Sequence, residues 1–122
     1  MRPFSLIINL FFYNMSRLAT LKNMLLQSPN DAFLLFAIAK EYEKQNLEQA
    51  ALAHYQQLTK ANPDYVGVYY HLGKWYERAQ NLAAAFATYQ KGMTIAKVQN
   101  DQHAYNELAA AKLNLGDDDD FL

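Results

Sequence analysis

Residues 32–65, AFLLFAIAKEYEKQNLEQAALAHYQQLTKANPDY, are followed directly by residues 66–99, VGVYYHLGKWYERAQNLAAAFATYQKGMTIAKVQ, and the two stretches repeat one another in register. Eight positions hold the same residue in both copies. They are Lys40/Lys74, Tyr42/Tyr76, Glu43/Glu77, Ala50/Ala84, Ala51/Ala85, Ala53/Ala87, Tyr55/Tyr89 and Gln56/Gln90. Self-similarity at a fixed period of about 34 residues indicates tandem copies of one supersecondary unit, which decides the fold.

Each copy has the apolar spacing of two helices joined by a tight turn. The first helix carries a stripe at i, i+3, i+4 and i+7, which is typical of one buried helix face. The stripe consists of Leu35, Ile38, Ala39 and Tyr42 in one copy and of Tyr69, Leu72, Gly73 and Tyr76 in the other. The second helices carry Ala51, Tyr55 and Leu58, and then Ala85, Tyr89 and Gly92.

Turn and cap residues mark where these helices begin and end. Gln45-Asn46-Leu47 and Gln80-Asn81-Leu82 hold the turns, and we expect the two Asn residues to adopt the left-handed conformation. Asn30-Asp31 and Asp64 are the expected N-caps of the first helices.

A unit with these features resembles the tetratricopeptide repeat. The matching positions are Leu35, Ile38-Ala39, Tyr42, Ala51, Tyr55 and Pro63 in the first copy, and Tyr69, Leu72-Gly73, Tyr76, Ala85 and Tyr89 in the second. The second copy departs from the pattern at Lys97, where the closing Pro is missing. The resemblance covers residues 16–99 and implies an all-α fold, an α-α superhelix, in a small stand-alone protein of bacterial type.

The offset between the two copies also organises the ends of this domain. It relates Pro29 to Pro63 and Leu18-Ala19 to Leu52-Ala53, so a helix over 16–27 corresponds to the second half of a unit. We therefore expect a domain over 16–116 that consists of a half repeat at 16–31, repeats at 32–65 and 66–99, and a capping helix at 101–115. Solenoids cover their last apolar face with such an atypical helix. Tyr105, Leu108, Ala109, Lys112 and Leu115 would form its packing face, and Gly116 would end it.

The two ends of the chain lie outside this pattern. Residues 1–15 form an apolar N-terminal extension, with the run Phe4–Tyr13 interrupted by Asn9, and the run is too short to span a bilayer as a helix. Three interpretations stay open: a misassigned extension upstream of a true start at Met15, a signal or anchor, and an apolar helix that packs on the domain. The acidic tail, residues 117–122, is expected to be disordered.

Composition and motifs argue against catalysis and cofactors. The chain has no cysteine, which excludes disulfides and thiolate zinc sites. His54, His71 and His103 lie on different predicted elements without paired Asp or Glu, and Glu41 and Glu43 diverge on one helix, so we expect neither a metal site nor an enzyme. The net charge of −1 includes four Asp of the tail, and the small basic excess elsewhere is too weak to predict nucleic-acid binding.

The resemblance implies a concave groove lined by the first helices, which holds a peptide or protein partner. The groove candidates are Phe33, Phe36, Lys40 and Lys44 in the first copy and Tyr70, His71, Lys74 and Arg78 in the second. Aromatic side chains beside a line of cations suit a partner with acidic side chains or a free carboxylate. Chaperone-binding members grip a C-terminus with Lys and Asn, but Phe36, Lys40 and His71 leave that clamp largely absent here. Ordinary solvated faces, with Glu43 and Glu77 as helix partners of the lysines, are the alternative.

The leading hypothesis from the sequence is therefore an interaction scaffold, not an enzyme, with no cofactor, no nucleic acid and no stable membrane insertion. The alternative is a structural module that self-associates as a homodimer and has no separate peptide ligand. The acidic tail, which ends in Phe121-Leu122, is a candidate to occupy the groove of its own or a neighbouring chain. Neutral, cysteine-free composition fits a cytoplasmic protein, with export open if residues 1–14 are a signal.

Overall fold

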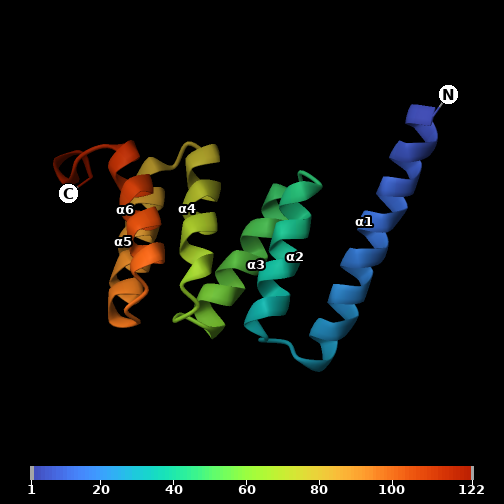
Figure 1. Cartoon of the computed structure of the whole chain (residues 1–122), viewed down its shortest axis with the longest axis horizontal. Coiled ribbons are helices and arrows are strands. Elements are labelled where there is room, and N and C mark those ends of the chain that lie inside the picture. The colour runs from blue at the N-terminus through green and yellow to red at the C-terminus, as the bar shows by residue number, and fades with distance from the viewer. Residues whose placement is uncertain (1, 122) are drawn as a thin grey trace. The chain divides into compact units, whose positions relative to one another are not determined.

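The computed structural model describes the backbone of residues 2–121 and the side chains of residues 6–10, 13 and 16–121. All elements in this part of the chain are helical, so the all-α prediction is confirmed. The chain divides into two compact units, Met1–Ala61 and Asn62–Leu122. The first holds α1 (Arg2–Gln27), α2 (Ala32–Lys44) and α3 (Glu48–Ala61). The second holds α4 (Gly67–Arg78), α5 (Leu82–Val98), α6 (Gln102–Leu115) and the short 3₁₀ helix η1 (Asp118–Asp120) (Figure 1).

An antiparallel helix pair forms the core of each unit, α2 with α3 and α4 with α5 (Figure 1). The predicted stripe is buried in the first unit, where Leu35, Ile38 and Ala39 are fully inaccessible to solvent. In the second unit Tyr69 and Leu72 are buried as expected, whereas Tyr76 is partly exposed and its neighbour Trp75 is buried. Burial of these apolar side chains is the main stabilising contribution, at about 1.5–3 kcal/mol for each large residue.

The three tight turns between helices share one hydrogen-bond pattern. Asn46, Gln80 and Asn100 have φ values of 60°, 62° and 58°. In each turn the next residue donates its backbone N–H to a helical carbonyl five residues earlier, at 2.9 Å, which is the Schellman pattern of a left-handed helix end. The left-handed conformation is thus correctly predicted for Asn46.

Two of the turn and cap predictions are wrong. The left-handed residue after α4 is Gln80, while Asn81 is the N-cap of α5 and accepts a hydrogen bond from the backbone N–H of Ala84. Asp31 is the N-cap of α2 as predicted, but the N-cap position of α4 is Val66, not Asp64.

Helix α1 is longer than predicted, since it runs without a break from Arg2 to Gln27 where the sequence predicted a start at residue 16. The helix packs against α2, and Leu21 is its one buried apolar side chain among those described. Leu6, Ile7, Leu10 and Tyr13 are each more than half exposed, with values of 64%, 65%, 56% and 60%. Among the described residues, no helix combines the length and apolar character needed to cross a membrane.

The C-terminal helix α6 packs against α5 and also contacts α4. Leu108 and Ala111 are its buried residues, while Tyr105, Ala109, Lys112 and Leu115 are partly exposed, so the predicted packing face is right only in part. Gly116 ends the helix as expected. The predicted disorder of the tail is wrong for the described residues, because Asp118–Asp120 form η1 and Phe121 stacks on Phe86 of α5.

The close approach within the α4–α5 pair leads to a first prediction. A Cβ atom on Gly73 would overlap Cε1 of Tyr89, whose ring is fully buried and whose hydroxyl is hydrogen-bonded to Glu77. We expect Gly73→Ala to lower the free energy of unfolding by about 1–3 kcal/mol relative to Gly67→Ala, because the added methyl group overpacks the pair.

Gly67→Ala is the matched control on the same helix, since the nearest side-chain atom, Tyr65 Cε1, would lie at an ordinary 3.7 Å. Urea unfolding followed by far-UV circular dichroism measures both variants. Equal midpoints would contradict the close approach.

Candidate functional site

The eight predicted groove residues fall on the first helix of each sequence repeat, α2 or α4. We call Phe33, Phe36, Lys40 and Lys44 the α2 face, and Tyr70, His71, Lys74 and Arg78 the α4 face. Three of the four members recur at equivalent positions of the two copies, as Phe36/Tyr70, Lys40/Lys74 and Lys44/Arg78. Their spacing of i, i+4 and i+8 places them along one side of each helix. Each unit thus brings its own members together on one helix side.

A three-residue network connects each face to the core beneath it. In the first unit the Tyr55 hydroxyl donates a hydrogen bond of 2.6 Å to Glu43 Oε1, and Lys40 Nζ lies 3.3 Å from the same oxygen. In the second unit the hydroxyl of Tyr89 donates to Glu77 Oε2, which lies 3.4 Å from Lys74 Nζ (Figure 1 shows the helices). The glutamate therefore receives a buried donor from the second helix and a partly exposed cation from its own helix.

The aromatic members of the two faces also pack in the same way. The ring centroids of Phe36 and Tyr55 are 6.3 Å apart, and those of Tyr70 and Tyr89 are 6.4 Å apart. On the α4 face His71 lies edge-on to Tyr70 at 5.5 Å, and Lys74 Nζ lies 5.5 Å from the centre of the Tyr70 ring. Each face therefore has an aromatic ring that packs on the helix behind, and on the α4 face this ring also lies beside a cation.

The two faces differ at their N-terminal ends. Phe33 is 68% exposed on α2, and the equivalent position in the second copy is Gly67. A ring this exposed remains in contact with water unless another molecule or another segment of the chain covers it. The α2 face therefore has an additional aromatic side chain that the α4 face lacks.

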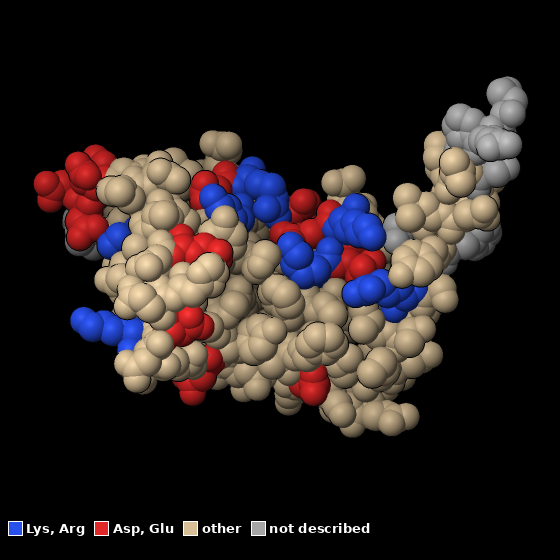
Figure 2. Space-filling model, in the orientation of Figure 1, with Lys and Arg blue, Asp and Glu red and all other residues tan. Residues whose placement is uncertain are grey.

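Charge is intermixed over both faces. On the side of the molecule in Figure 2, basic and acidic atoms lie next to one another over α2 and over α4, and the acidic atoms gather separately at the C-terminal tail. Lys40 pairs with Glu43 on α2 and Lys74 pairs with Glu77 on α4, so basic and acidic groups alternate along each helix.

Burial changes the acidity of two tyrosines in the second unit. Burial, the hydrogen bond to Glu77 and the charge of that carboxylate raise the pKa of Tyr89 far above its usual range. Burial and the charge of Asp64 also raise the pKa of Tyr69, whose hydroxyl donates to the carbonyl oxygen of Pro63 at 2.6 Å. Both phenols therefore act as hydrogen-bond donors, not as acids.

The sequence analysis did not predict three polar contacts, one between α1 and α2 and one within each helix pair. Glu41 is buried at 6% exposure, and its Oε1 lies 2.9 Å from Nε of Arg17 on α1. The role of Glu43 and Glu77 as acceptors for the tyrosines was also missed. The recurrence of Glu and Tyr at the same spacing in both copies was the available signal.

The other candidates for chemistry are dispersed. Glu41 and Glu43 contact different partners, which agrees with their predicted divergence. The predicted absence of a carboxylate near any histidine is wrong for His103, whose Nε2 lies 4.0 Å from Glu107 Oε2, but the His103 side chain is 92% exposed. His54 Nδ1 contacts the carbonyl oxygen of Ala50 at 2.9 Å. Within the described residues, no three His, Asp or Glu side chains come together as metal ligands would.

The chain is similar to several solved structures. A crystal structure of a tetratricopeptide repeat domain protein from Salinibacter ruber is 41% identical with a TM-score of 0.67, and the match covers 70% of this chain and 94% of that chain. A solution structure of a tetratricopeptide repeat domain protein from the same organism is 41% identical with a TM-score of 0.69, over 71% of this chain and 88% of that chain. The solution structure of protein BPP2914 from Bordetella parapertussis is 26% identical with a TM-score of 0.69, over 80% and 85% of the two chains.

Both source organisms are bacteria, which fits the expected bacterial origin. No family model matches the chain, and a search of curated proteins finds no match.

The raised pKa of Tyr89 leads to a prediction for alkaline stability. Above pH about 10 the unfolded chain loses phenol protons that folded Tyr89 retains, so the free energy of unfolding falls as the pH rises. Tyr89→Phe removes this phenol from both states. We expect urea midpoints of the variant to decline less steeply between pH about 8 and about 11 than those of the unaltered chain. Parallel declines would show that Tyr89 ionises normally.

Proposed function

This chain belongs to the tetratricopeptide repeat family, and we propose that it binds a peptide or protein partner against the α2 and α4 faces. The fold generally mediates protein–protein interactions and typically serves as a noncatalytic scaffold. The proposal assigns the chain no catalytic role and no cofactor. The neutral, cysteine-free composition supports a cytoplasmic location within this proposal.

One observation carries the proposal, namely that both copies repeat an exposed pattern as well as a buried one. Core packing accounts for the recurrence of Tyr55 and Tyr89, which are fully buried. The side chains of Lys40 and Lys74 are 43% and 37% exposed and yet recur in the same register, each four residues after an aromatic residue. An aromatic ring flanked by an oriented cation is a common centre of a protein-binding surface.

The chemistry of the two faces favours a partner with acidic side chains or a free carboxylate. A lysine ammonium has three donor hydrogens, so Lys40 and Lys74 can bond a further oxygen while they remain near Glu43 and Glu77. Helical ion pairs at i, i+3 contribute only about 0.2–0.5 kcal/mol, so a partner carboxylate competes with them at little cost. The adjoining rings would bury apolar side chains of the same partner.

Self-association is the second candidate function, and α1 supplies its observation. Leu6, Ile7, Leu10 and Tyr13 are exposed on a helix whose N-terminal half is predominantly apolar. Water contact with so much apolar surface is unfavourable, at about 25 cal/mol for each Å². A homodimer that covers these side chains would make the chain a structural module without a separate ligand.

Charge reversal tests the leading proposal. We expect Lys40→Glu with Lys74→Glu to abolish capture of any partner that binds these faces, because the reversed charges repel acidic groups. Affinity capture with the purified chain, read by quantitative mass spectrometry, measures the loss. Lys60→Glu with Lys97→Glu, one exposed lysine on α3 and one on α5, is the control with the same change in net charge. Equal capture by the two double variants would refute the assignment.

Light scattering tests the second candidate. If α1 mediates self-association, the molar mass should rise to that of a dimer with concentration, and Leu6→Gln with Leu10→Gln should restore the monomer mass of 14.0 kDa. Lys91→Gln, at an exposed position of α5, serves as control. A concentration-independent monomer would rule out the structural role and leave the partner-binding function standing.

A further inference from the structure

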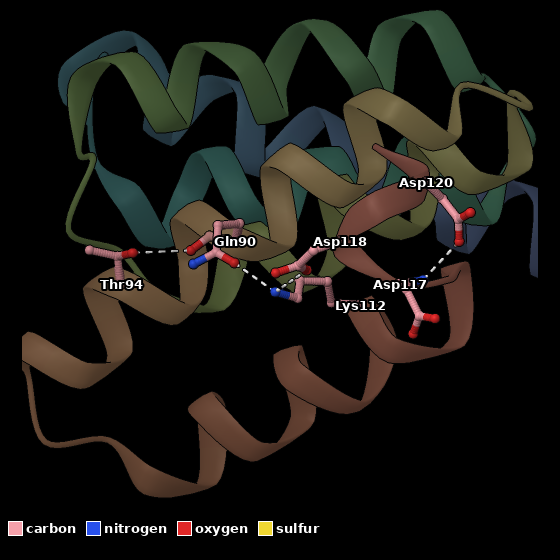
Figure 3. A network of polar contacts seen from close by, with 6 residues as sticks. All are labelled: Gln90, Thr94, Lys112, Asp117, Asp118 and Asp120. Carbon is pink, nitrogen blue, oxygen red and sulfur yellow. Dashed lines mark hydrogen bonds and ion pairs between the residues drawn. The ribbon is translucent and has the colours of Figure 1, made fainter. Parts of the chain in front are cut away.

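The C-terminal tail occupies a defined position on the second unit. The Phe121 ring stacks on the Phe86 ring of α5, with centroids 4.6 Å apart and planes 18° apart. Three residues earlier, Asp118 Oδ1 lies 3.3 Å from Lys112 Nζ of α6 (Figure 3). We call Phe86, Gln90 and Lys112 the tail site. These residues belong to α5 and α6, so the tail does not lie on the α4 face, where the sequence suggested that it could dock.

The cation of the tail site is held in place by the unit itself. Lys112 Nζ donates to Gln90 Oε1 at 2.8 Å and lies 5.0 Å from the centre of the Phe86 ring. The Lys112 side chain is only 17% exposed, whereas its ion-pair partner Asp118 is 62% exposed. Figure 3 shows Lys112 directed between Gln90 and Asp118. Lys112 is therefore held in place and largely buried, whereas Asp118 of the tail faces solvent.

A turn at Gly116 directs the tail back onto this site. Gly116 has φ 141°, and a Cβ atom there would lie 2.6 Å from Asp120 Oδ2. The same carboxylate oxygen accepts a hydrogen bond of 2.9 Å from the backbone N–H of Asp117 (Figure 3). These local contacts shape the tail so that Asp118 and Phe121 reach Lys112 and Phe86 together.

We propose that the tail site is a second docking surface, which recognises a partner-protein segment with an aspartate three residues before an aromatic residue. The tail of this chain then acts as a tethered competitor for that segment. The inference goes beyond the proposed function, because it concerns a different surface and a different pair of helices. It rests on charge and ring complementarity that the seated tail already satisfies.

The seated tail is readily displaced, for two physical reasons. The Asp118 end of its ion pair is 62% exposed, and ion pairs in contact with solvent are weak and screened by salt. Its short connection to α6 gives it an effective concentration of about millimolar, so the closed state does not require a tight intrinsic contact. A free segment of the same chemistry therefore competes once its own affinity exceeds that of the tail.

The experiment uses the full chain and a fluorescent peptide that copies residues 116–122. The receptor with an open site is the Asp118→Asn, Phe121→Ala double variant of the full chain, which loses both tail contacts. We expect the peptide to bind this variant about ten-fold more tightly than the unaltered chain, because the native tail competes in cis. Fluorescence polarisation at low salt measures both affinities.

Matched controls assign the binding to the tail site. Adding Lys112→Met to the open variant should abolish peptide binding, whereas Lys91→Met on α5 should leave it unchanged, and a peptide with Ala in place of its Phe should not bind. Circular dichroism confirms that each variant is folded. Equal affinity for the open variant and the unaltered chain, or no binding to a folded open variant, would overturn the proposal.

A second copy of the chain is the alternative occupant. If light scattering shows that the unaltered chain forms a dimer and the open variant a monomer, the tail exchanges between copies and the partner assignment is refuted. Since Lys40 and Lys74 are unchanged in these variants, the outcome is independent of the charge-reversal test.

Discussion

A buried tyrosine hydroxyl on α3 or α5 positions a glutamate and, through it, an exposed lysine on the helix that precedes it. Tyr55 and Tyr89 are fully buried, and each donates to a glutamate of the first helix, Glu43 or Glu77. The phenol needs this acceptor, because a buried unsatisfied donor costs about 1–3 kcal/mol. The glutamate in turn attracts the lysine three residues before it. The position of the exposed cation thus follows from a contact in the core.

The repeat period predicted those features that depend on residues within one copy. The buried stripe of α2, the helix pairs and the left-handed Asn46 all follow from local sequence, whereas on α4 Trp75 is buried in place of the predicted Tyr76. The error at Asn81 shows the limit of reasoning from residue type. Gln80 is the equivalent of Asn46 in the second copy, so the backbone keeps the period even though Gln is a less favourable left-handed residue. Asn81 then falls at the N-cap, where its side chain bonds Ala84.

Contacts that join the repeat to residues outside it could not be predicted. Position 41 holds Glu and the equivalent position 75 holds Trp, and both are buried. The charge at Glu41 is tolerated because α1 supplies Arg17, although Glu41 Oε2 has no hydrogen-bond partner among the described residues. The Arg17 side chain is 51% exposed, so the pair gives little net stability once the desolvation of Glu41 is set against the attraction. The contact of Phe121 with Phe86 could not be predicted either, because the tail lies outside the repeat and no periodicity relates it to α5.

Helix stability accounts for the basic residues of the candidate site but not for all of its aromatic residues. Basic residues in the last helical turn, Lys44 and Arg78, interact favourably with the helix dipole, and Lys40 and Lys74 pair with glutamates. Neither effect accounts for Phe33, which is 68% exposed on α2, whereas a glycine occupies the equivalent position on α4. Covering a side chain of this size is worth about 1.5–3 kcal/mol. Under the proposed function, Phe33 would give a partner additional apolar contact at the α2 face, while both faces would offer it cations at equivalent positions.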